Sequence, residues 1–359
     1  MTQREKEILD LIAQDPMIQQ QTIADRLGIT RSSVAVHISN LTRKGYIAGK
    51  GYVIRSGTYA AVVGGVNVDI GGRSFAPLVA ADSNPGTVSI TVGGVGRNIA
   101  NNLALMGTEV RMLTAVGDDR NGQHALSHCL AQGMDMSNAL VVPGAATSTY
   151  LYLTGPDGEM ALAVSDMSVC QQVTPAYLAA NLNVLRNARV VVADTNIPAE
   201  SLAFLAENVT VPLFVDPVST AKAEKLRPIL HKIHTLKPNR MEAEFLSGVP
   251  IREKEDFPKA AKALRRMGVK RVFISLGADG VYAADEAGEV WLPTLPGKMV
   301  NTTGCGDAFM AALVWAEMEA LDLEHTALAG LAAGSIAMES QLTINPEMNA
   351  DAIRERMMR

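Results

Sequence analysis

The chain has 359 residues, 48% hydrophobic and 19% charged, and this balance excludes a disordered or fibrous protein. No apolar run reaches the length of a transmembrane helix, and the polar start over residues 1–10 does not fit a signal peptide. The three cysteines are odd in number and lack metal-ligand spacing, which argues against a disulfide framework or a zinc site and predicts a cytoplasmic location.

The net charge of −5 is unevenly distributed along the chain. Residues 1–55 hold eight lysines and arginines against five acids, so the rest of the chain carries an excess of eight negative charges. A basic head on an acidic body indicates two units with different partners. We therefore expect a small domain over residues 1–56 and a large domain over residues 57–359.

The first unit has the pattern of three short helices. An apolar stripe over residues 8–12 predicts the first helix, and residues 20–27 form a second that ends at Gly28. Thr30 is a candidate N-cap for the third helix. Two apolar pieces between glycines, residues 46–47 and 52–54, predict a β-hairpin wing. The inward side of the third helix is expected to hold Val34, Ile38 and Leu41.

A helix–turn–helix with a wing resembles the winged-helix DNA-binding domains of bacterial transcription regulators. The outward face of the third helix carries side chains of the types that contact bases and phosphates in a major groove. The alternative is a solvated face on a docking or oligomerisation domain. Because a charge of +3 binds DNA weakly, we expect a dimer. The predicted DNA contacts are Arg31, Ser33, His37 and Lys44.

From Thr58 onward, short apolar runs alternate with helical segments, which predicts an α/β fold with a mostly parallel sheet covered by helices. Several of the runs end in Asp, Asn or Gly, where open α/β sheets bind ligands. The expected strands are residues 59–65, 189–194, 213–216, 235–238 and 271–276.

Three β-rich segments interrupt this alternation, at residues 87–92, 148–153 and 159–164. Each alternates polar with apolar residues, as expected for strands with one exposed face. We predict that they form a small sheet outside the main one, a lid over the active site at about residues 71–92 and 147–166.

A glycine turn at residues 303–306 leads directly into an apolar helix that begins with Asp307. Unpaired N–H groups at a helix N-terminus face an anion, and glycines let it approach closely. A carboxylate there would repel a phosphate unless it takes up a proton. Asp307 is therefore predicted to be a base that acts on a hydroxyl during phosphoryl transfer.

The chain has neither a P-loop nor a Gly-x-Gly-x-x-Gly fingerprint, so any phosphate site is of another kind. The glycine turn at residues 93–98 either binds a ligand or only packs a strand tightly against a helix. Asp69, just past the first strand, either forms a turn or binds sugar hydroxyls.

Two further patterns have a structural and a functional interpretation. Asn239 and Glu242 are three residues apart, which suits either a water-bound Mg²⁺ beside phosphates or an ordinary capping box. Residues 277–280 form either a hairpin turn or a backbone cradle for a nucleotide.

These motifs resemble, in order and spacing, those of the ribokinase-like (PfkB) carbohydrate kinases over about residues 59–350. The resemblance implies a three-layer α/β/α fold with a small β lid, and transfer of the γ-phosphoryl group of ATP to a sugar hydroxyl, with Mg²⁺ and often K⁺. Simpler members lack a winged-helix head. Residues 81–86, 93–100, 214–219 and 233–240 are similar to family members that phosphorylate the 5′-hydroxyl of pseudouridine.

The resemblance also assigns the predicted site. It makes Asp307 the base, with Gly304, Cys305 and Gly306 as N–H donors to the transferring phosphoryl oxygens. The family usually has Ala in place of Cys305, which is either an inert small residue or an oxidation-sensitive thiol. The substrate-binding residues implied are Asn67, Asp69, Gly93, Gly94 and Asn98, with Asp166 as a further candidate whose alternative is a surface turn.

On the nucleotide side, the resemblance implies that Glu242 holds Mg²⁺ through water and that Asn301 helps to hold K⁺. The expected ATP-binding residues are Asn239, Ser275, Gly277, Gly280 and Thr303.

Two other functions stay open at this point. The first is a kinase for another nucleoside or sugar, and the second is a transcription regulator whose kinase fold only senses a ligand. A homodimer is the default for both units.

Overall fold

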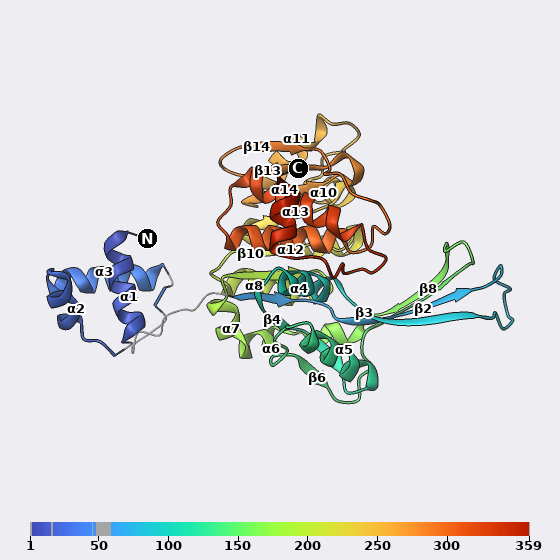
Figure 1. Ribbon diagram of the computed structural model, residues 1–359, viewed down its shortest axis with the longest axis horizontal. Coiled ribbons are helices and arrows are strands. Elements are labelled where there is room, and N and C mark those ends of the chain that lie inside the picture. The colour runs from blue at the N-terminus through green and yellow to red at the C-terminus, as the bar shows by residue number, and fades with distance from the viewer. Residues whose placement is uncertain (1, 16, 45, 48–58, 359) are drawn as a thin grey trace. The chain divides into compact units, whose positions relative to one another are not determined.

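The computed structural model describes residues 2–15, 17–44, 46–47 and 59–358 and divides into two compact units, Met1–Gly57 and Thr58–Arg359 (Figure 1). Among the described residues, no helix combines the length and the hydropathy that a membrane span requires. The second apolar piece of the predicted wing, residues 52–54, lies outside the described residues. Of the first piece, Ile47 is buried in the core of this unit and Tyr46 packs against it.

The first unit contains the three predicted helices, α1 (Gln3–Gln14), α2 (Gln20–Leu27) and α3 (Arg31–Arg43). Gly28 ends α2 with a φ of 63°, and the Thr30 hydroxyl caps α3 by accepting from the Ser33 N–H. Thr2 and Glu5 form a capping box at the start of α1. The inward-facing residues are confirmed in a small apolar core that includes Ile8, Ile12, Ile23, Val34, Ile38 and Leu41.

The second unit is built on an eight-stranded sheet in the order β14-β13-β12-β11-β10-β9-β1-β4. The strands from β4 to β12 pair in parallel, and β13 and β14 add antiparallel at one edge. The five predicted strands are confirmed, whereas β4, β13 and β14 were not predicted. The strands are β1 (Tyr59–Val63), β4 (Glu109–Leu113), β9 (Val190–Asp194), β10 (Leu213–Asp216), β11 (Thr235–Leu236), β12 (Arg271–Ser275), β13 (Val281–Ala284) and β14 (Glu289–Leu292).

Helices cover both faces of this sheet, which gives the expected three-layer α/β/α architecture. Alternate residues of β1 enter two separate cores, Ala60 and Val62 on one side and Ala61 and Val63 on the other. The helices are α4 (Val95–Leu105), α5 (Arg120–Ala131), α6 (Pro175–Ala180), α7 (Leu182–Asn187), α8 (Ala199–Asn208), α9 (Thr220–Ala223), α10 (Arg240–Ser247), α11 (Asp256–Arg266), α12 (Cys305–Met318), α13 (Leu323–Ala337) and α14 (Ala350–Met357), with 3-10 turns η1 (Ser168–Gln172), η2 (Glu224–Lys232) and η3 (Gly277–Asp279).

The predicted lid is present as a second sheet of four strands in the order β3-β2-β7-β8, projecting from the body of the unit (Figure 1). It begins earlier than expected, because β2 starts at Asn67, so Asp69 lies in a strand and not in a turn. These strands are β2 (Asn67–Ser74), β3 (Gly86–Gly93), β7 (Thr149–Thr154) and β8 (Met160–Asp166), and β5 (Ala115–Gly117) pairs separately with β6 (Leu140–Val142).

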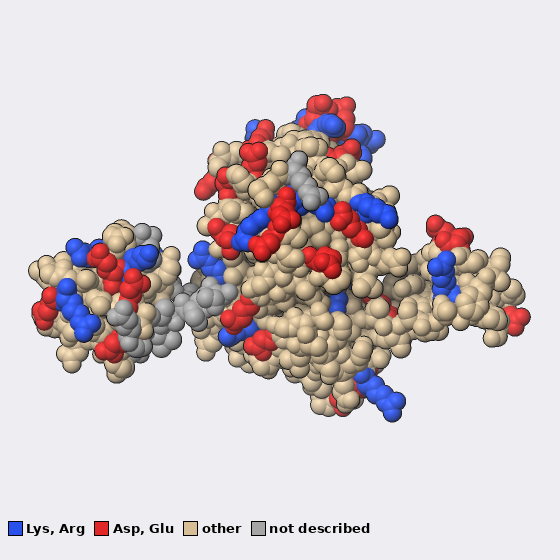
Figure 2. Space-filling model, viewed as in Figure 1, with Lys and Arg blue, Asp and Glu red and all other residues tan. Residues whose placement is uncertain are grey.

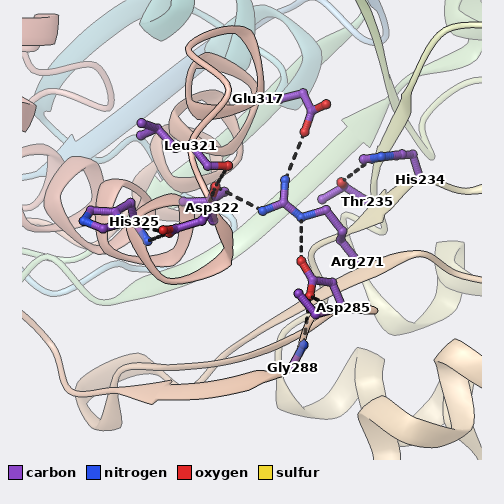
Figure 3. A network of polar contacts seen from close by, with 11 residues as sticks. His234, Thr235, Arg271, Asp285, Gly288, Glu317, Leu321, Asp322 and His325 are labelled. Atoms are coloured by element: carbon purple, nitrogen blue, oxygen red, sulfur yellow. Dashed lines mark hydrogen bonds and ion pairs between the residues drawn. The ribbon is translucent and has the colours of Figure 1, made fainter.

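A buried arginine at the start of β12 connects the main sheet to the helices beside it (Figure 3). Nη1 of Arg271 donates to Glu317 of α12 at 3.0 Å, and Nη2 donates to Thr326 of α13 at 3.1 Å. Its Nε lies 3.6 Å from an oxygen of Asp285, which follows β13. Because these groups lie at the amino-terminal end of β12, they stabilise the fold at the edge opposite to the predicted site.

Candidate functional site

The predicted site residues gather at the carboxyl edge of the main sheet, where the base of the lid meets the N-termini of two helices. Helices α4 and α12 pack side by side there (Figure 1). This packing brings Asn98 of α4 to Asp307 of α12, and Nδ2 of Asn98 donates to Oδ2 of Asp307 at 2.8 Å. The two residues are far apart in the sequence, so the contact depends on the tertiary fold.

Helix α12 begins at a glycine turn that has no side-chain cap. Gly304, its N-cap, has a φ of 86°, and a Cβ there would overlap the carbonyl oxygen of Thr343. No side chain caps the helix, and the Cys305 N–H donates to the carbonyl oxygen of Thr302 at 3.3 Å. Burial and the nearby Asp307 raise the pKa of Cys305, which disfavours the thiolate and supports the inert interpretation of this residue.

Asp307 has the electrostatics of a base that works near neutral pH. Burial, followed by repulsion from Asp216, raises its pKa from 3.8 to about 7. The hydrogen bond from Asn98 and the attraction of Lys237 act in the opposite direction. A carboxylate with this pKa exchanges a proton readily around pH 7.

Lys237, predicted only as part of the strand over residues 235–238, lies at the centre of this site. Its Nζ is 3.1 Å from Oδ2 of Asp216, and both side chains are 7% exposed. The same Nζ is 3.5 Å from the position that a Cβ on Gly306 would occupy, so the cation lies beside the open start of α12. Burial lowers the pKa of Lys237, but attraction to Asp216 and Glu242 outweighs it and leaves the pKa raised.

Asp69 lies against the glycine turn, as the substrate-site prediction requires. Strands β2 and β3 pair so that Gly93 faces Asn67, and a Cβ on Gly93 would overlap Oδ2 of Asp69. Nδ2 of Asn67 donates to Oδ1 of Asp69 at 2.5 Å. Burial raises the pKa of Asp69, opposed by this hydrogen bond and by the charge of Arg97.

A second buried carboxylate, Asp194, holds the backbone of the turns and was not predicted as a site residue. Its oxygens accept from the N–H groups of Gly65, Gly96 and Asn196 at 2.7–2.9 Å. Gly94, at the start of α4, has a φ of 104°, and a Cβ there would overlap the carbonyl oxygen of Gly65. The glycine turn thus packs tightly against the loop after β1 and also forms one wall of the candidate site.

Asn239 and Glu242 form the capping box that was one of their two interpretations. Oε2 of Glu242 accepts from the Asn239 N–H at 2.9 Å, and Oδ1 of Asn239 accepts from the Glu242 N–H at 3.0 Å. Burial, and then repulsion from Asp216, raises the pKa of Glu242. Because the box uses only Oε2, the carboxylate retains an oxygen for a water ligand of a cation.

The donor set fits Mg²⁺ that arrives with a nucleotide. Among the described residues, no three His, Cys, Asp or Glu side chains converge as a metal cage. Mg²⁺ needs only one or two carboxylates, because phosphate oxygens and water complete its shell. Asp216 and Glu242 are buried carboxylates beside the open start of α12 and meet this requirement.

The predicted nucleotide residues lie on neighbouring loops. Asn239, Ser275 and Gly277 line one cavity of about 370 Å³, together with Arg252 and Lys254. Gly280 serves the connection between β12 and β13, since its φ is 98° and a Cβ would overlap the carbonyl oxygen of Leu292. This segment is therefore a hairpin connection whose first residues border a cavity.

Asn301 joins two loops near the start of α12. Its Oδ1 accepts from the Thr303 N–H at 3.0 Å, and its Nδ2 donates to the carbonyl oxygen of Gln341 at 3.2 Å. Asn301 thus positions the backbone carbonyls of both loops, and its side-chain oxygen already has a donor.

Asp166, the further substrate candidate, lies exposed at the end of β8. Its Oδ1 accepts from the Ser168 N–H at 3.0 Å, and hydrogen bonding to Ser168 lowers its pKa. These contacts are those of the surface-turn alternative.

The predicted DNA contacts on α3 differ in exposure and in their partners. Arg31 is exposed, whereas Ser33 and His37 are half-buried. Nζ of Lys44 is 2.8 Å from a carboxylate oxygen of Glu5, whose side chain is 2% exposed. The hydrogen bond from Lys44 is the first cause that lowers the pKa of Glu5 to about 2. Lys44 therefore ties α3 to α1, and a phosphate would have to compete with Glu5 for it.

Comparison with known proteins covers both units. The pfkB family carbohydrate kinase domain matches residues 58–350, and a winged helix-turn-helix DNA-binding domain matches residues 1–48. The uncharacterized sugar kinase YeiI of Escherichia coli is 41% identical over 355 residues, 98% of each chain. The pseudouridine kinase of the same organism is 41% identical over 298 residues, 82% of this chain and 95% of its own.

Two solved structures show the same kinase fold. A carbohydrate kinase from Agrobacterium tumefaciens has a TM-score of 0.76 at 26% identity, covering 84% of this chain and 97% of its own. The Arabidopsis thaliana ribokinase, solved with ribose and ATP, has a TM-score of 0.75 at 22% identity, covering 84% of this chain and 98% of its own.

Proposed function

Because this chain belongs to the pfkB family of carbohydrate kinases, we propose that it transfers the γ-phosphoryl group of ATP to the 5′-hydroxyl of pseudouridine. One observation carries the proposal. Asp307, at the open start of α12, has a pKa of about 7 and accepts a hydrogen bond from Asn98 of the glycine-turn helix. A ligand-sensing protein without catalysis has no use for a base in this position.

In the proposed reaction, Asp307 accepts the proton of the substrate hydroxyl as that oxygen bonds to the γ-phosphorus. The bond from the γ-phosphorus to the bridging oxygen breaks, and ADP leaves with that oxygen. Backbone N–H groups of Cys305 and Gly306 and the Lys237 cation face the charge on the transferring phosphoryl oxygens. Bound Mg²⁺, held by Glu242 through water and by Asp216, would neutralise charge on the ATP phosphates.

The wall formed by β2 and the glycine turn, beside Asp307, is proposed to hold the ribose. Asp69, supported by Asn67, provides a carboxylate beside the glycine turn, and Asn98 provides an amide. Together they pair with vicinal hydroxyls, so an analogue without the 2′-hydroxyl leaves one oxygen of the half-buried Asp69 carboxylate without its donor and binds poorly. Asp166 remains a proposed contact of the base or ribose.

The choice of pseudouridine rests on the similarity to the E. coli enzyme. A kinase for another nucleoside or sugar is the alternative, since the sugar kinase YeiI is equally identical and its substrate is not named. We also propose that the enzyme works in the cytoplasm and that backbone carbonyls of the two loops joined by Asn301 hold an activating K⁺.

We propose a homodimer formed through the lid. The pairing of Ile70 with Ile90 and Leu151, and of Leu151 with Val164, places these side chains on one face of the lid sheet. The face is apolar and exposed, and Figure 2 shows mostly uncharged side chains over the lid. A second copy of this face is its proposed partner, because burying such a patch favours association. Sedimentation equilibrium of Ile90→Lys and wild type measures whether the dimer depends on this face.

For the first unit we propose sequence-specific DNA binding near the protein's own operon, with exposed Arg31 as the leading phosphate contact. Together with the kinase activity, such a DNA-binding unit would let the protein couple the presence of its own substrate to DNA binding. Mobility-shift assays at low salt measure this binding, and no retention of such DNA would refute it.

A coupled ADP-release assay tests the kinase proposal. The panel contains pseudouridine, uridine, ribose and fructose 6-phosphate, and pseudouridine is expected to have the highest kcat/KM. The matched variant Asp307→Asn should bind nucleoside but lose turnover. If only another compound of the panel is phosphorylated, that compound and not pseudouridine is the substrate. If none of them is phosphorylated, the proposed function is contradicted.

A further inference from the structure

Arg97, which no motif assigned a role, is buried beside the proposed base. It lies in α4 next to Asn98, and its side chain is almost fully inaccessible. Burying a guanidinium costs free energy unless hydrogen bonds and opposite charges compensate for the lost water. Its Nε has no partner among the described residues, so the two Nη groups determine how it is held.

Both Nη groups contact neighbours that orient the site. Nη1 donates to Oδ1 of Asn98 at 2.9 Å, and Nη2 lies 2.7 Å from Nε2 of His128 in α5. Because a guanidinium only donates, Nε2 of His128 must accept, which requires the neutral ring with its proton on Nδ1. Burial, and then the charge of Arg97, lowers the pKa of His128 and favours that neutral form.

The contact with Arg97 decides how the Asn98 amide is turned. An amide is nearly symmetric in shape, and only its partners distinguish the oxygen from the nitrogen. With Oδ1 facing Arg97, Nδ2 must face Asp307, to which it donates at 2.8 Å. In the opposite orientation the amide oxygen would face a carboxylate oxygen and repel it.

The positive charge of Arg97 also interacts with the carboxylates of the candidate site. It attracts both Asp69, the proposed ribose carboxylate, and Asp307. The Cys129 thiol also lies beside the guanidinium, and burial raises its pKa, so it stays uncharged. Within the described part of the chain no carboxylate forms an ion pair with Arg97, so Asp69 and Asp307 attract it from a longer distance.

We propose that Arg97 is a positioning residue: it fixes the Asn98 amide so that Nδ2 donates to Asp307, and it thereby keeps Asp307 ready to accept the substrate proton. This inference rests on the proposed phosphoryl transfer. Arg97 acts through Asn98 and does not touch the reacting atoms. Replacing Arg97 should therefore change kcat and the pH dependence of kcat more than the affinity for nucleotide.

The test compares Arg97→Met with Arg271→Met, which removes a buried arginine at the opposite edge of the sheet. In the ADP-release assay, Arg97→Met should lower kcat by about 10- to 100-fold with little change in KM for ATP. The acid limb of its kcat profile should move to higher pH by about half a unit or more, because Asp307 loses an oriented donor and a nearby cation. Arg271→Met should lower thermal stability without moving the limb.

Arg97→Lys is the second variant, because it keeps a buried cation and folds more readily. A lysine offers one point charge and cannot donate to Asn98 and His128 in the fixed geometry of the guanidinium, so kcat should recover only in part. An Arg97→Met enzyme with the wild-type kcat and pH profile would overturn the inference while leaving the kinase function intact. An inactive wild-type chain would overturn both.

Discussion

Two buried cations lie at opposite edges of the same sheet, and their surroundings differ. At the amino-terminal edge, Arg271 meets Asp285, Glu317 and the Thr326 hydroxyl (Figure 3). At the carboxyl edge, Lys237 is paired directly with Asp216 and attracted by Glu242 and Asp307.

The difference lies in how completely the protein itself satisfies each cluster. Both Nη groups of Arg271 donate to acceptors in two helices, and its Nε forms an ion pair with Asp285 at 3.6 Å without a hydrogen bond. Its two carboxylate partners are 13% and 24% exposed to water. Around Lys237 the carboxylates outnumber the cation, and the pKa values of Asp307 and Glu242 are raised. The cluster around Arg271 stabilises the fold. The electrostatic energy of the cluster around Lys237 becomes favourable only when Mg²⁺, a phosphate or a substrate proton binds there.

The largest effect is expected from Asp307→Asn, which removes the proposed base. The turnover number should fall by about 10³-fold, because a positioned base typically contributes that much. ADP release with saturating nucleoside measures it, and nucleotide affinity by calorimetry serves as the control. A variant within tenfold of wild type would show that another group takes the proton.

Lys237→Met should affect both activity and stability. We expect kcat to fall by about 10²-fold from the lost charge on the phosphoryl oxygens. The free energy of unfolding should fall by about 3 kcal/mol, because the buried Asp216 is left unpaired. Adding Asp216→Leu should restore stability but not turnover. Recovery of both would mean that Lys237 is only structural.

Arg271→Met should lower the free energy of unfolding by about 2 kcal/mol, since a buried cation and its hydrogen bonds are lost. Turnover should stay within about twofold, because the network lies at the other edge of the sheet. Denaturant unfolding with parallel kinetics measures both quantities. A large loss of kcat without a loss of stability would show that the Arg271 cluster takes part in turnover and is not only structural.

A smaller effect concerns stability as a function of pH. The folded pKa of Asp307 is about 7 against an ordinary 3.8, so folding favours its protonated form and loses stability as pH rises between these values. Asp307→Asn should therefore be more stable than wild type by about 1 kcal/mol or more above pH 7, with no gain near pH 4. Thermal melts across this range measure the gain, and a constant difference would contradict the pKa.

The smallest effect is expected in the first unit. Arg31→Ala should reduce the slope of log affinity for DNA against log salt by about one, as expected for one lost phosphate contact. Fluorescence anisotropy from low to moderate salt measures this slope. The matched variant Lys44→Ala should mainly destabilise the unit, since Lys44 is paired with Glu5.

Much of the fold was predictable because its signals are local. The buried parallel strands are continuous apolar runs, and Gly28 and Gly304 mark a helix end and a helix start with positive φ. The edge strands β4 and β14 were missed because each is partly exposed and begins with a glutamate. Asp69 was placed just past the first strand and outside the lid, because the lid strand that contains it is recognisable only from its pairing with β3.

Site residues could be predicted where they lie in one contiguous sequence motif. They could not be predicted where the contact joins segments that are distant in the sequence. Asp307 could be proposed as the base because its glycine turn and its helix are contiguous in the sequence. Lys237 was missed because its importance comes from Asp216 on another strand and from Gly306 on a distant helix. The sequence did contain one indication of this pair, since Asp216 and Lys237 are charged residues at the ends of two buried strands. Arg97 was missed for the same reason, since His128 lies in another helix.

The most direct test of the proposed chemistry is the single-turnover rate of phosphoryl transfer to pseudouridine as a function of pH, in wild type and in Asp307→Asn. For wild type, the rate should rise about tenfold per pH unit below 7 and level off above it, because Asp307 must be deprotonated to act as the base. The variant should be slow and nearly independent of pH over the same range. A variant that retains the wild-type rate and the same pH-dependent rise would contradict the assignment of Asp307 as the base.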